Sequence, residues 1–284
     1  MARPVQSESA SRVEGPSSVP LDLPVFAADG KSVIVALDHA LAGGQLPSLD
    51  RPADLIERIS GGAPDGLILT VGMSRVRGTT RAPWLLTADY YATSVFPGGS
   101  GEDDVHTLAW DDEAANALGA CGLKCLLVFG RRDPRQLEVN VTRVAALVTK
   151  AHRAGLPVMI EATLWGARIS ATQQHDATMI CHAARVAFEL GADVIKIPLP
   201  DDAEALARLT DALPVPIVIM GGAAGRADEL FFHVERALRA GVRGVAMGRN
   251  VWQARDPAAY IAALRSMVHG GATAADAVES VRAG

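Results

Sequence analysis

The chain has 284 residues, of which 49% are hydrophobic and 21% charged, and its formal net charge is −5 at pH 7. These values are typical of a globular protein with one large core. A net negative charge gives no electrostatic reason to expect nucleic acid or an anionic membrane as a partner. No apolar run reaches the roughly 18 residues that a membrane-spanning helix needs.

Residues 1–24 are rich in Ser, Pro, Glu and Arg and show little periodicity, which predicts a flexible leader before one domain over residues 25–284. The N-terminus lacks the basic region and apolar run of a signal peptide. An odd number of cysteines, three, argues against a disulfide framework. We therefore expect a cytoplasmic protein.

From Lys31 onward, short β-branched runs alternate with Ala-, Leu- and Arg-rich helical stretches, as in βα units on a parallel sheet. The predicted strands are Ser32–Leu37, Gly66–Val71, Trp84–Ala88, Lys124–Phe129, Val158–Glu161, Asp193–Ile197, Pro216–Met220 and Gly244–Met247. The predicted helices are Ala53–Ile59, Pro134–Ala154, Thr178–Leu190, Ala203–Leu213, Asp228–Ala240 and Pro257–Val268.

Eight strands in a chain of this length predict an α/β protein built as a single (β/α)8 TIM barrel. A doubly wound open sheet is the alternative fold. That fold would need a G-x-G-x-x-G turn after an early strand, and the sequence has none. Because the active sites of TIM barrels lie at the carboxyl ends of the strands, residues that close the predicted strands are the candidates for function.

Lysine is rare in this chain, yet Lys196 stands inside the apolar predicted strand Asp193–Ile197. Side-chain alternation puts Lys196 on the same face as Val194. Facing the barrel interior, its amine would reach the active-site mouth, whereas facing the helices it would be a costly buried charge. Burial lowers the pKa of an amine and makes it a nucleophile toward carbonyl groups. The alternative is a lysine that only pairs with a neighbouring acid.

Glycine-rich turns follow the last two predicted strands. Gly221 and Gly222 follow the seventh strand, and Gly248 and Arg249 follow the eighth. In TIM barrels the backbone N–H groups of these two turns commonly hold a phosphate, and an arginine adds a charged fork that suits phosphate oxygens. Asn250 is predicted as the N-cap of a short helix at this site. The alternative is a pair of tight turns without a ligand.

Acidic residues close three other predicted strands: Asp38, which precedes His39, then Asp89 and Glu161. Neighbouring strands lie about 4.8 Å apart, so Glu161 can reach Lys196 and transfer protons during a reaction there. We predict that Asp38 holds substrate hydroxyls or joins the proton relay, and that His39 and Asp89 contact the substrate. The alternatives are solvated or capping acids.

Two arginines, Arg131 and Arg132, follow the fourth predicted strand and are candidates for binding a second anionic group. A solvated loop pair beside Asp133 is the alternative. The seven histidines are scattered, with no H-E-x-x-H motif and no Cys/His pair at ligand spacing. The sequence therefore predicts no metal site.

Together these segments resemble the class I (Schiff-base) aldolases of the archaeal fructose-bisphosphate type. That group includes the aminodideoxyheptulosonate synthases, the autoinducer-2 thiolases and, more distantly, the tagatose-bisphosphate aldolases. The matching segments are Leu37–His39, Gly191–Lys196, Pro214–Gly222 and Gly244–Gln253.

The resemblance implies a metal-independent lyase with a Schiff base on Lys196 and no separate cofactor. It also implies a phosphate role for Gly221, Gly222, Gly248 and Arg249, a phosphorylated ketose or ketone as substrate, and a homo-oligomer by analogy.

The archaeal enzymes carry a tyrosine general acid after strand five, where this chain has Ile160–Gly166 without a tyrosine. A glutamate at that position resembles the tagatose-bisphosphate and sulfo-sugar aldolases, which supports Glu161 as the acid–base residue. Two other functions stay open. One is a phospho-sugar transferase of the transaldolase or thiolase type, or an isomerase, on the same barrel. The other is a non-catalytic sensor that binds phospho-sugars.

Overall fold

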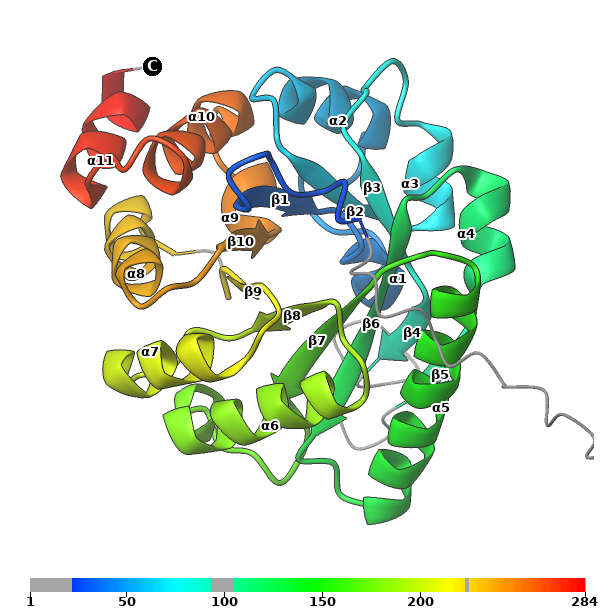
Figure 1. The fold of residues 1–284 in the computed structure, drawn as a ribbon. Helices are drawn as coiled ribbons and strands as arrows, with labels where there is room; N and C mark the ends of the chain where they lie inside the picture. The colour runs from blue at the N-terminus through cyan, green and yellow to red at the C-terminus, as the bar shows by residue number, and fades with distance from the viewer. Residues whose placement is uncertain (1–21, 93–104, 223–224, 284) are drawn as a thin grey trace, which may run out of the picture.

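A closed barrel of eight parallel strands forms the centre of the computed structural model, which describes residues 22–92, 105–222 and 225–283. The strand order around the barrel is β1-β10-β9-β8-β7-β6-β3-β2, and helices surround it (Figure 1). The barrel strands are β1 Ser32–Ala36, β2 Gly66–Leu69, β3 Trp84–Thr87, β6 Gly122–Phe129, β7 Val158–Leu164, β8 Val194–Ile197, β9 Ile217–Ile219 and β10 Gly244–Met247. The predicted TIM barrel is confirmed.

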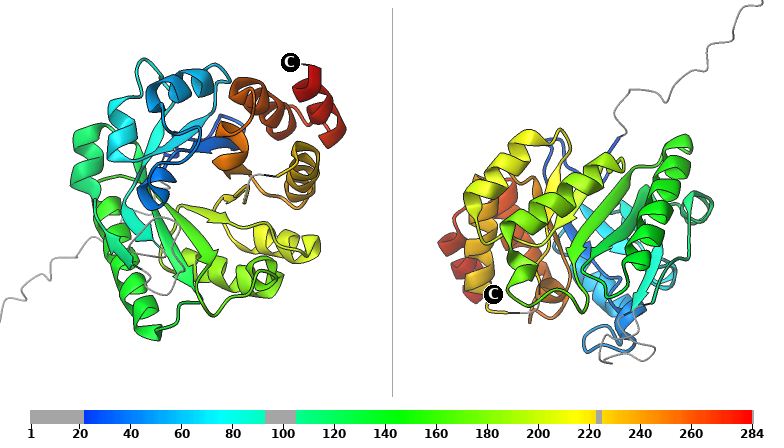
Figure 2. Two further views of the ribbon diagram at one scale, coloured as in Figure 1. Left: turned by 180° about the vertical axis from the view of Figure 1, so that it is seen from behind. Right: turned by 90° about the horizontal axis from the view of Figure 1, so that it is seen from below.

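The six predicted helices are all present, with ends shifted by a few residues. They are α2 Pro52–Ser60, α5 Pro134–Arg153, α6 Ala177–Glu189, α7 Ala203–Ala212, α8 Ala227–Arg239 and α10 Pro257–Val268. Additional short helices are α1 Ala40–Gly43, α3 Val71–Arg75, α4 Asp112–Leu118, η1 Gln173–His175 and α9 Arg249–Trp252. A last helix, α11 Ala274–Ala283, packs outside α8 and α10 (Figure 2). None of the helices in the described ranges is long and apolar enough to cross a membrane.

Aspartates fix where several of these helices begin. The side chains of Asp111, Asp133, Asp176, Asp202 and Asp256 each accept a hydrogen bond from a backbone N–H in the first turn of the helix that follows. An N-cap aspartate satisfies one of the four N–H groups that a helix start leaves unpaired. The helix starts are therefore encoded locally, independently of the barrel.

Alternation along the strands separates two apolar layers. Outward-facing side chains such as Ile195 and Ile197 join the large core between strands and helices, whereas Val194 and Met159 join a cluster inside the barrel. Lys196 is two residues after Val194 and therefore faces the barrel interior. This is the inward one of the two orientations that the sequence left open.

The amino-terminal segment closes the bottom of the barrel. Val25 is 1% exposed and belongs to the interior cluster, and Leu23 packs against that cluster. Residues 1–21 of the predicted leader lie outside the described residues.

A hairpin that the sequence analysis did not predict follows β3. Its strands are β4 Asp89–Ala92 and β5 Val105–Leu108, paired antiparallel. Asp89 therefore begins β4 and does not close the third barrel strand, so its predicted position was wrong. The chain leaves the barrel at Ala88, whose N–H donates to Lys124 O on β6 while its carbonyl accepts from Ala109 N and Trp110 N.

Replacing Gly244 tests the close contact between the backbones of β10 and β1. Gly244 pairs in register with Ser32 of β1, its φ is +144°, and an added Cβ would overlap the Ser32 carbonyl. We expect Gly244→Ala to lower the free energy of unfolding by about 2 kcal/mol or more in urea denaturation. The control is Gly72→Ala in α3, where a Cβ meets only Thr70 Oγ1 at 3.8 Å. It should be neutral or stabilising by up to about 1 kcal/mol. Equal losses in both variants would contradict the prediction.

Candidate active site

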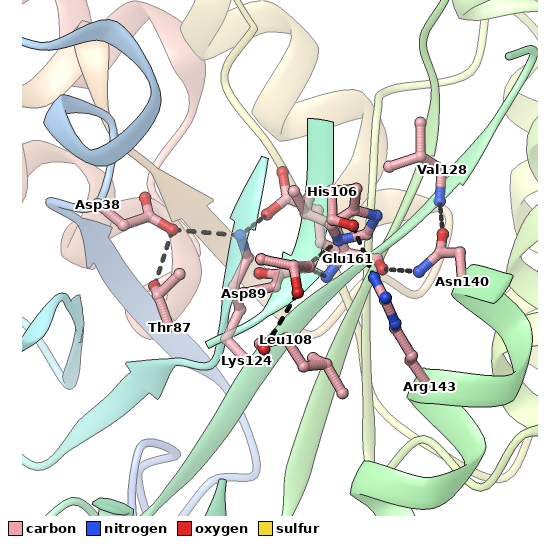
Figure 3. A network of polar contacts seen from close by, with 12 residues as sticks. Asp38, Thr87, Asp89, His106, Leu108, Lys124, Val128, Asn140, Arg143 and Glu161 are labelled. Carbon is pink, nitrogen blue, oxygen red and sulfur yellow. Dashed lines mark hydrogen bonds and ion pairs between the residues drawn. The ribbon is translucent and has the colours of Figure 1, made fainter. Parts of the chain in front are cut away.

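Four ionisable side chains form a continuous chain of contacts inside the barrel. Lys196 Nζ donates to Glu161 Oε2 at 3.1 Å, and Lys124 Nζ lies 2.8 Å from the same oxygen. Lys124 Nζ also lies 3.1 Å from Asp38 Oδ2, which accepts a hydrogen bond from the Thr87 hydroxyl at 2.9 Å. Figure 3 shows this network from Asp38 through Lys124 to Glu161. The structure thus joins three of the predicted catalytic residues through a lysine that the prediction did not include.

Strand register explains why these side chains meet. Glu161 and Lys196 are register partners on β7 and β8, and Thr87 and Lys124 are register partners on β3 and β6. Partners on neighbouring parallel strands have side chains on the same face and at the same level. All four ionisable side chains are nearly buried, since the most exposed, Asp38, is 11% exposed.

In this network, charge pairing affects the pKa values more strongly than burial does. Burial alone would raise the pKa of the Asp38 and Glu161 carboxyls, but the Lys124 ammonium holds both pKa values below their ordinary range. Burial alone would lower the pKa of Lys124, but the two carboxylates hold that pKa above its ordinary value. Both acids are therefore ionised at neutral pH, and Lys124 carries its proton.

A cavity of about 180 Å³ opens beside this network, at the carboxyl ends of the strands. Lys196, Glu161, Lys124 and Asp38 line it together with the predicted phosphate-binding residues Gly221, Gly222, Gly248 and Arg249. The Lys196 amine and the glycine turns therefore share one cavity. Within the described ranges, no group of three or more His, Cys, Asp and Glu side chains is placed to hold a metal ion.

Asn250 connects the two glycine turns. Its Nδ2 donates to Gly221 O at 2.8 Å, and its Oδ1 accepts from Gly225 N at 3.2 Å. The prediction of Asn250 as an N-cap was wrong, because α9 begins at Arg249 and Gly248 is its N-cap. The amide of Asn250 is used instead to hold the turn after β9 against the turn after β10.

His39 lines the cavity next to Asp38, with its Nδ1 3.5 Å from Asp38 Oδ1. Burial lowers the pKa of His39 below its ordinary value, and the attraction of Asp38 does not reverse that effect. A neutral imidazole can hydrogen-bond a substrate hydroxyl but adds no positive charge for a phosphate.

Asp89 also lines the cavity, although from the hairpin rather than from a barrel strand. Its Oδ2 accepts hydrogen bonds from His106 Nε2 and from Leu126 N, both at 2.7 Å. Its Oδ1 is buried and has no hydrogen-bond partner among the residues the structure describes.

Lys124 and the aromatic pair of Tyr91 and Trp165 were not predicted as site residues. Lys124 was placed at the start of a predicted strand, but β6 already begins at Gly122, so Lys124 is an interior strand residue. The rarity of lysine in this chain was the signal that pointed to it. The Tyr91 and Trp165 rings stack with centroids 5.7 Å apart and both line the cavity.

The two arginines predicted to bind a second anion do not line this cavity. The guanidinium of Arg131 lies 5.2 Å from the centroid of the Tyr91 ring. Arg131 lines a separate cavity with His106 and Arg143. Neither Arg131 nor Arg132 is among the residues that surround Lys196.

Residues 32–254 match a protein family described as DeoC/LacD family aldolase. The chain belongs to this family. The 2-amino-4,5-dihydroxy-6-oxo-7-(phosphonooxy)heptanoate synthase of Streptomyces griseus is 29% identical over 84% of this chain and 85% of its own length. The class 1 fructose-bisphosphate aldolase of Thermoproteus tenax is 29% identical over 88% of this chain and 94% of its own length.

A solved structure of an archaeal fructose-1,6-bisphosphate aldolase, with its catalytic lysine covalently bound to the carbinolamine intermediate of the substrate, shares this fold. It has a TM-score of 0.74 and 25% identity, and the match covers 86% of this chain and 96% of that one. This chain is a class I aldolase, and the resemblance drawn from its sequence is confirmed.

Removing Lys124 tests whether the charge network stabilises the fold. Lys124→Met would leave the Asp38 and Glu161 carboxylates buried without the ammonium between them. We expect urea denaturation at pH 7 to show a loss of about 3–5 kcal/mol in the free energy of unfolding. The control is Lys150→Met, because Lys150 is 60% exposed and lies 3.5 Å from Asp111. That pair should contribute less than about 1 kcal/mol.

The loss in Lys124→Met should depend on pH. Because the folded pKa values of Asp38 and Glu161 are lowered, their ionisation stabilises the fold above the ordinary carboxyl pKa of about 4. That stabilisation disappears as the pH falls through the folded values. The difference between the native protein and Lys124→Met should be largest near pH 7 and shrink below about pH 4. A pH-independent difference would argue against the network.

Proposed function

We propose that this aldolase cleaves or forms a carbon–carbon bond in a phosphorylated ketose through a Schiff base on Lys196. The observation that carries the proposal is a buried amine, hydrogen-bonded to Glu161 at 3.1 Å, in the cavity that Gly221 and Arg249 also line. The two relatives above support the substrate class, because the name of each contains a phosphorylated sugar or keto compound.

In the cleavage direction the Lys196 amine attacks the ketone carbonyl, and loss of one water gives an iminium. The carbon–carbon bond one atom away then breaks, and its electron pair moves into the enamine. The hydroxyl on the departing carbon gives its proton to Glu161 as that carbon becomes an aldehyde. Protonation of the enamine and addition of one water release the ketone and restore the amine.

Glu161 suits the role of base in this scheme because its lowered pKa keeps it ionised at neutral pH. The same carboxyl returns the proton in the synthetic direction. Lys124 contacts both Glu161 and Asp38, so it fixes the position and the charge of both acids. Asp38 and His39 are assigned to the substrate hydroxyls next to the reacting carbonyl, and Asp89 to a hydroxyl farther along the substrate.

The glycine turns are assigned to the phosphate. Gly221 and Gly248 leave no room for a side chain, because an added Cβ would lie 2.7 Å from Asn250 Nδ2 at the first and overlap His39 at the second. Turns of this kind let a phosphate approach the backbone N–H groups. The exposed guanidinium of Arg249 completes the site with a charged partner.

Two further parts of the proposal rest on the family resemblance: the reaction needs no metal ion and no cofactor apart from the covalent adduct, and the protein assembles as a homo-oligomer. A cytoplasmic location is proposed from the sequence alone. A second candidate, transfer of the enamine to an acceptor as in transaldolases, is favoured by the Streptomyces griseus relative, whose name describes a synthase. Turnover that requires an added acceptor would distinguish it from simple cleavage.

Reductive trapping tests the nucleophile. Incubation with dihydroxyacetone phosphate and borohydride should add one triose phosphate to Lys196, as read by peptide mass spectrometry. Lys196→Arg should show no adduct and no measurable turnover, because a guanidinium does not form the imine. EDTA should leave the activity of the native enzyme unchanged. A native protein that stays unmodified across a panel of phosphorylated ketones would refute the Schiff-base proposal.

Glu161→Gln separates imine formation from proton transfer. We expect kcat to fall at least about 100-fold, because general acid–base groups contribute roughly 10²–10⁴-fold. The borohydride adduct on Lys196 should still form. Loss of turnover with trapping retained would also exclude a non-catalytic sensor, since the native protein turns over. A kcat within a few-fold of the native value would remove Glu161 from the mechanism.

A further inference from the structure

The strand order gives the cavity two distinguishable ends. Lys196 lies on β8, with β9 and β10, which carry the glycine turns, on one side. On the other side lie β7 with Glu161, β6 with Lys124, and the hairpin that follows β3. A ketone with its phosphate on the glycine turns and its carbonyl at Lys196 must extend its remaining carbons toward β7, β6 and the hairpin. This second end therefore holds the half that leaves as an aldehyde.

Two arginine side chains lie at the phosphate end. A second cavity, of about 670 Å³, shares Gly221, Gly222 and Arg249 with the first. Arg236, the Asp201 carboxylate, His175 and His233 also line it, and burial lowers the pKa of His233. The described residues thus offer an anion the guanidinium groups of Arg249 and Arg236 at this end.

The aldehyde end has the opposite character. The stacked Tyr91 and Trp165 rings and Leu126 form its apolar wall, and the Asp89 carboxylate, which accepts a hydrogen bond from Leu126 N, lies beside them. The basic side chain on this side, among the described lining residues, is Lys124, which Glu161 and Asp38 already neutralise.

Among the described residues, no arginine lines this end of the cavity. The Arg131 guanidinium lies over the Tyr91 ring and faces a separate cavity. A phosphate on the aldehyde half would therefore approach the Asp89 carboxylate with no arginine or unpaired lysine in the described cavity wall at this end, which is unfavourable in a desolvated cavity.

The hydrogen bonds of Asp89 indicate which polar group the aldehyde half of the substrate carries. Asp89 Oδ2 is occupied by His106 and Leu126 N, but its buried Oδ1 has no partner in the described part of the chain. A carboxylate oxygen accepts a hydrogen bond from a hydroxyl and repels a phosphate. A buried acceptor without a donor requires an explanation, and a ligand hydroxyl that enters the cavity beside Asp89 would supply one.

We propose that the aldehyde half of the substrate is an uncharged, hydroxylated aldehyde, so that this enzyme acts on ketose 1-phosphates in preference to ketose bisphosphates. This inference rests on the proposed Schiff-base function and names its substrate class. The phosphate stays at the basic end, and a hydroxyl of the aldehyde half donates to Asp89 Oδ1.

Paired aldehydes that differ only in a phosphate test the inference. Dihydroxyacetone phosphate is condensed with glyceraldehyde or glyceraldehyde 3-phosphate, and with erythrose or erythrose 4-phosphate. We expect kcat/KM to be at least about tenfold higher for the unphosphorylated member of each pair. Equal or higher values for the phosphorylated members would overturn the inference. So would turnover of neither member while the borohydride adduct on Lys196 still forms.

Two substitutions of Ala42, one charged and one neutral, test whether charge at the aldehyde end determines the preference. Ala42 is exposed, lines the cavity, and lies on α1, which packs against β4. Ala42→Arg should raise kcat/KM for the phosphorylated aldehydes and narrow the preference several-fold, whereas the neutral Ala42→Gln should keep the native preference. Equal ratios in the two variants would count against charge as the basis of selection.

The trapping experiment keeps the two proposals apart. Absence of a borohydride adduct with dihydroxyacetone phosphate would refute the Schiff-base function, and the preference for neutral aldehydes would fall with it. A normal adduct combined with preference for phosphorylated aldehydes would refute the substrate class alone.

Discussion

The row of Lys196, Glu161, Lys124 and Asp38, buried in an otherwise apolar barrel, is the arrangement on which the site depends. Moving an ionised group out of water costs several kcal/mol, so each member requires a partner of opposite charge within reach. Here a single oxygen, Glu161 Oε2, contacts both lysines at 2.8 and 3.1 Å. Lys124 therefore keeps two acids ionised next to the Lys196 amine, and a shift of any one strand would separate these paired side chains.

One end of the barrel contributes mainly to stability, and the other end carries the candidate active site. At the bottom, Val25 and the interior cluster exclude water with apolar side chains alone. At the top, the polar network opens into the cavity between the glycine turns and the hairpin. TIM barrels commonly separate these tasks in the same way, which lets the loops change while the core is kept. The β4–β5 hairpin is such a loop element, because it brings Tyr91 and Asp89 to the aldehyde end.

Membership of the class I aldolases does not determine how charge is distributed along the cavity, because that depends on the side chains of each protein. In this protein a glutamate within β7 contacts the lysine, and the segment after that strand supplies Trp165, whose ring stacks on Tyr91. A cavity wall with carboxylates disfavours a phosphorylated aldehyde, whereas a wall with basic side chains favours it. Repulsion between like charges can exclude a ligand as effectively as attraction between opposite charges binds one. The chemistry can thus be shared across the family while the preferred aldehyde differs.

Local patterns in the sequence determined the eight strands, the six main helices, the face that Lys196 shares with Val194 and the two glycine turns, because alternation and turn chemistry act over a few residues. Only the tertiary structure decided that Lys124 pairs with Asp38 and Glu161, that Asn250 connects two turns, and that Arg131 lies outside the cavity. These contacts join strands far apart in the chain. They depend on barrel register and closure, which no short segment encodes by itself.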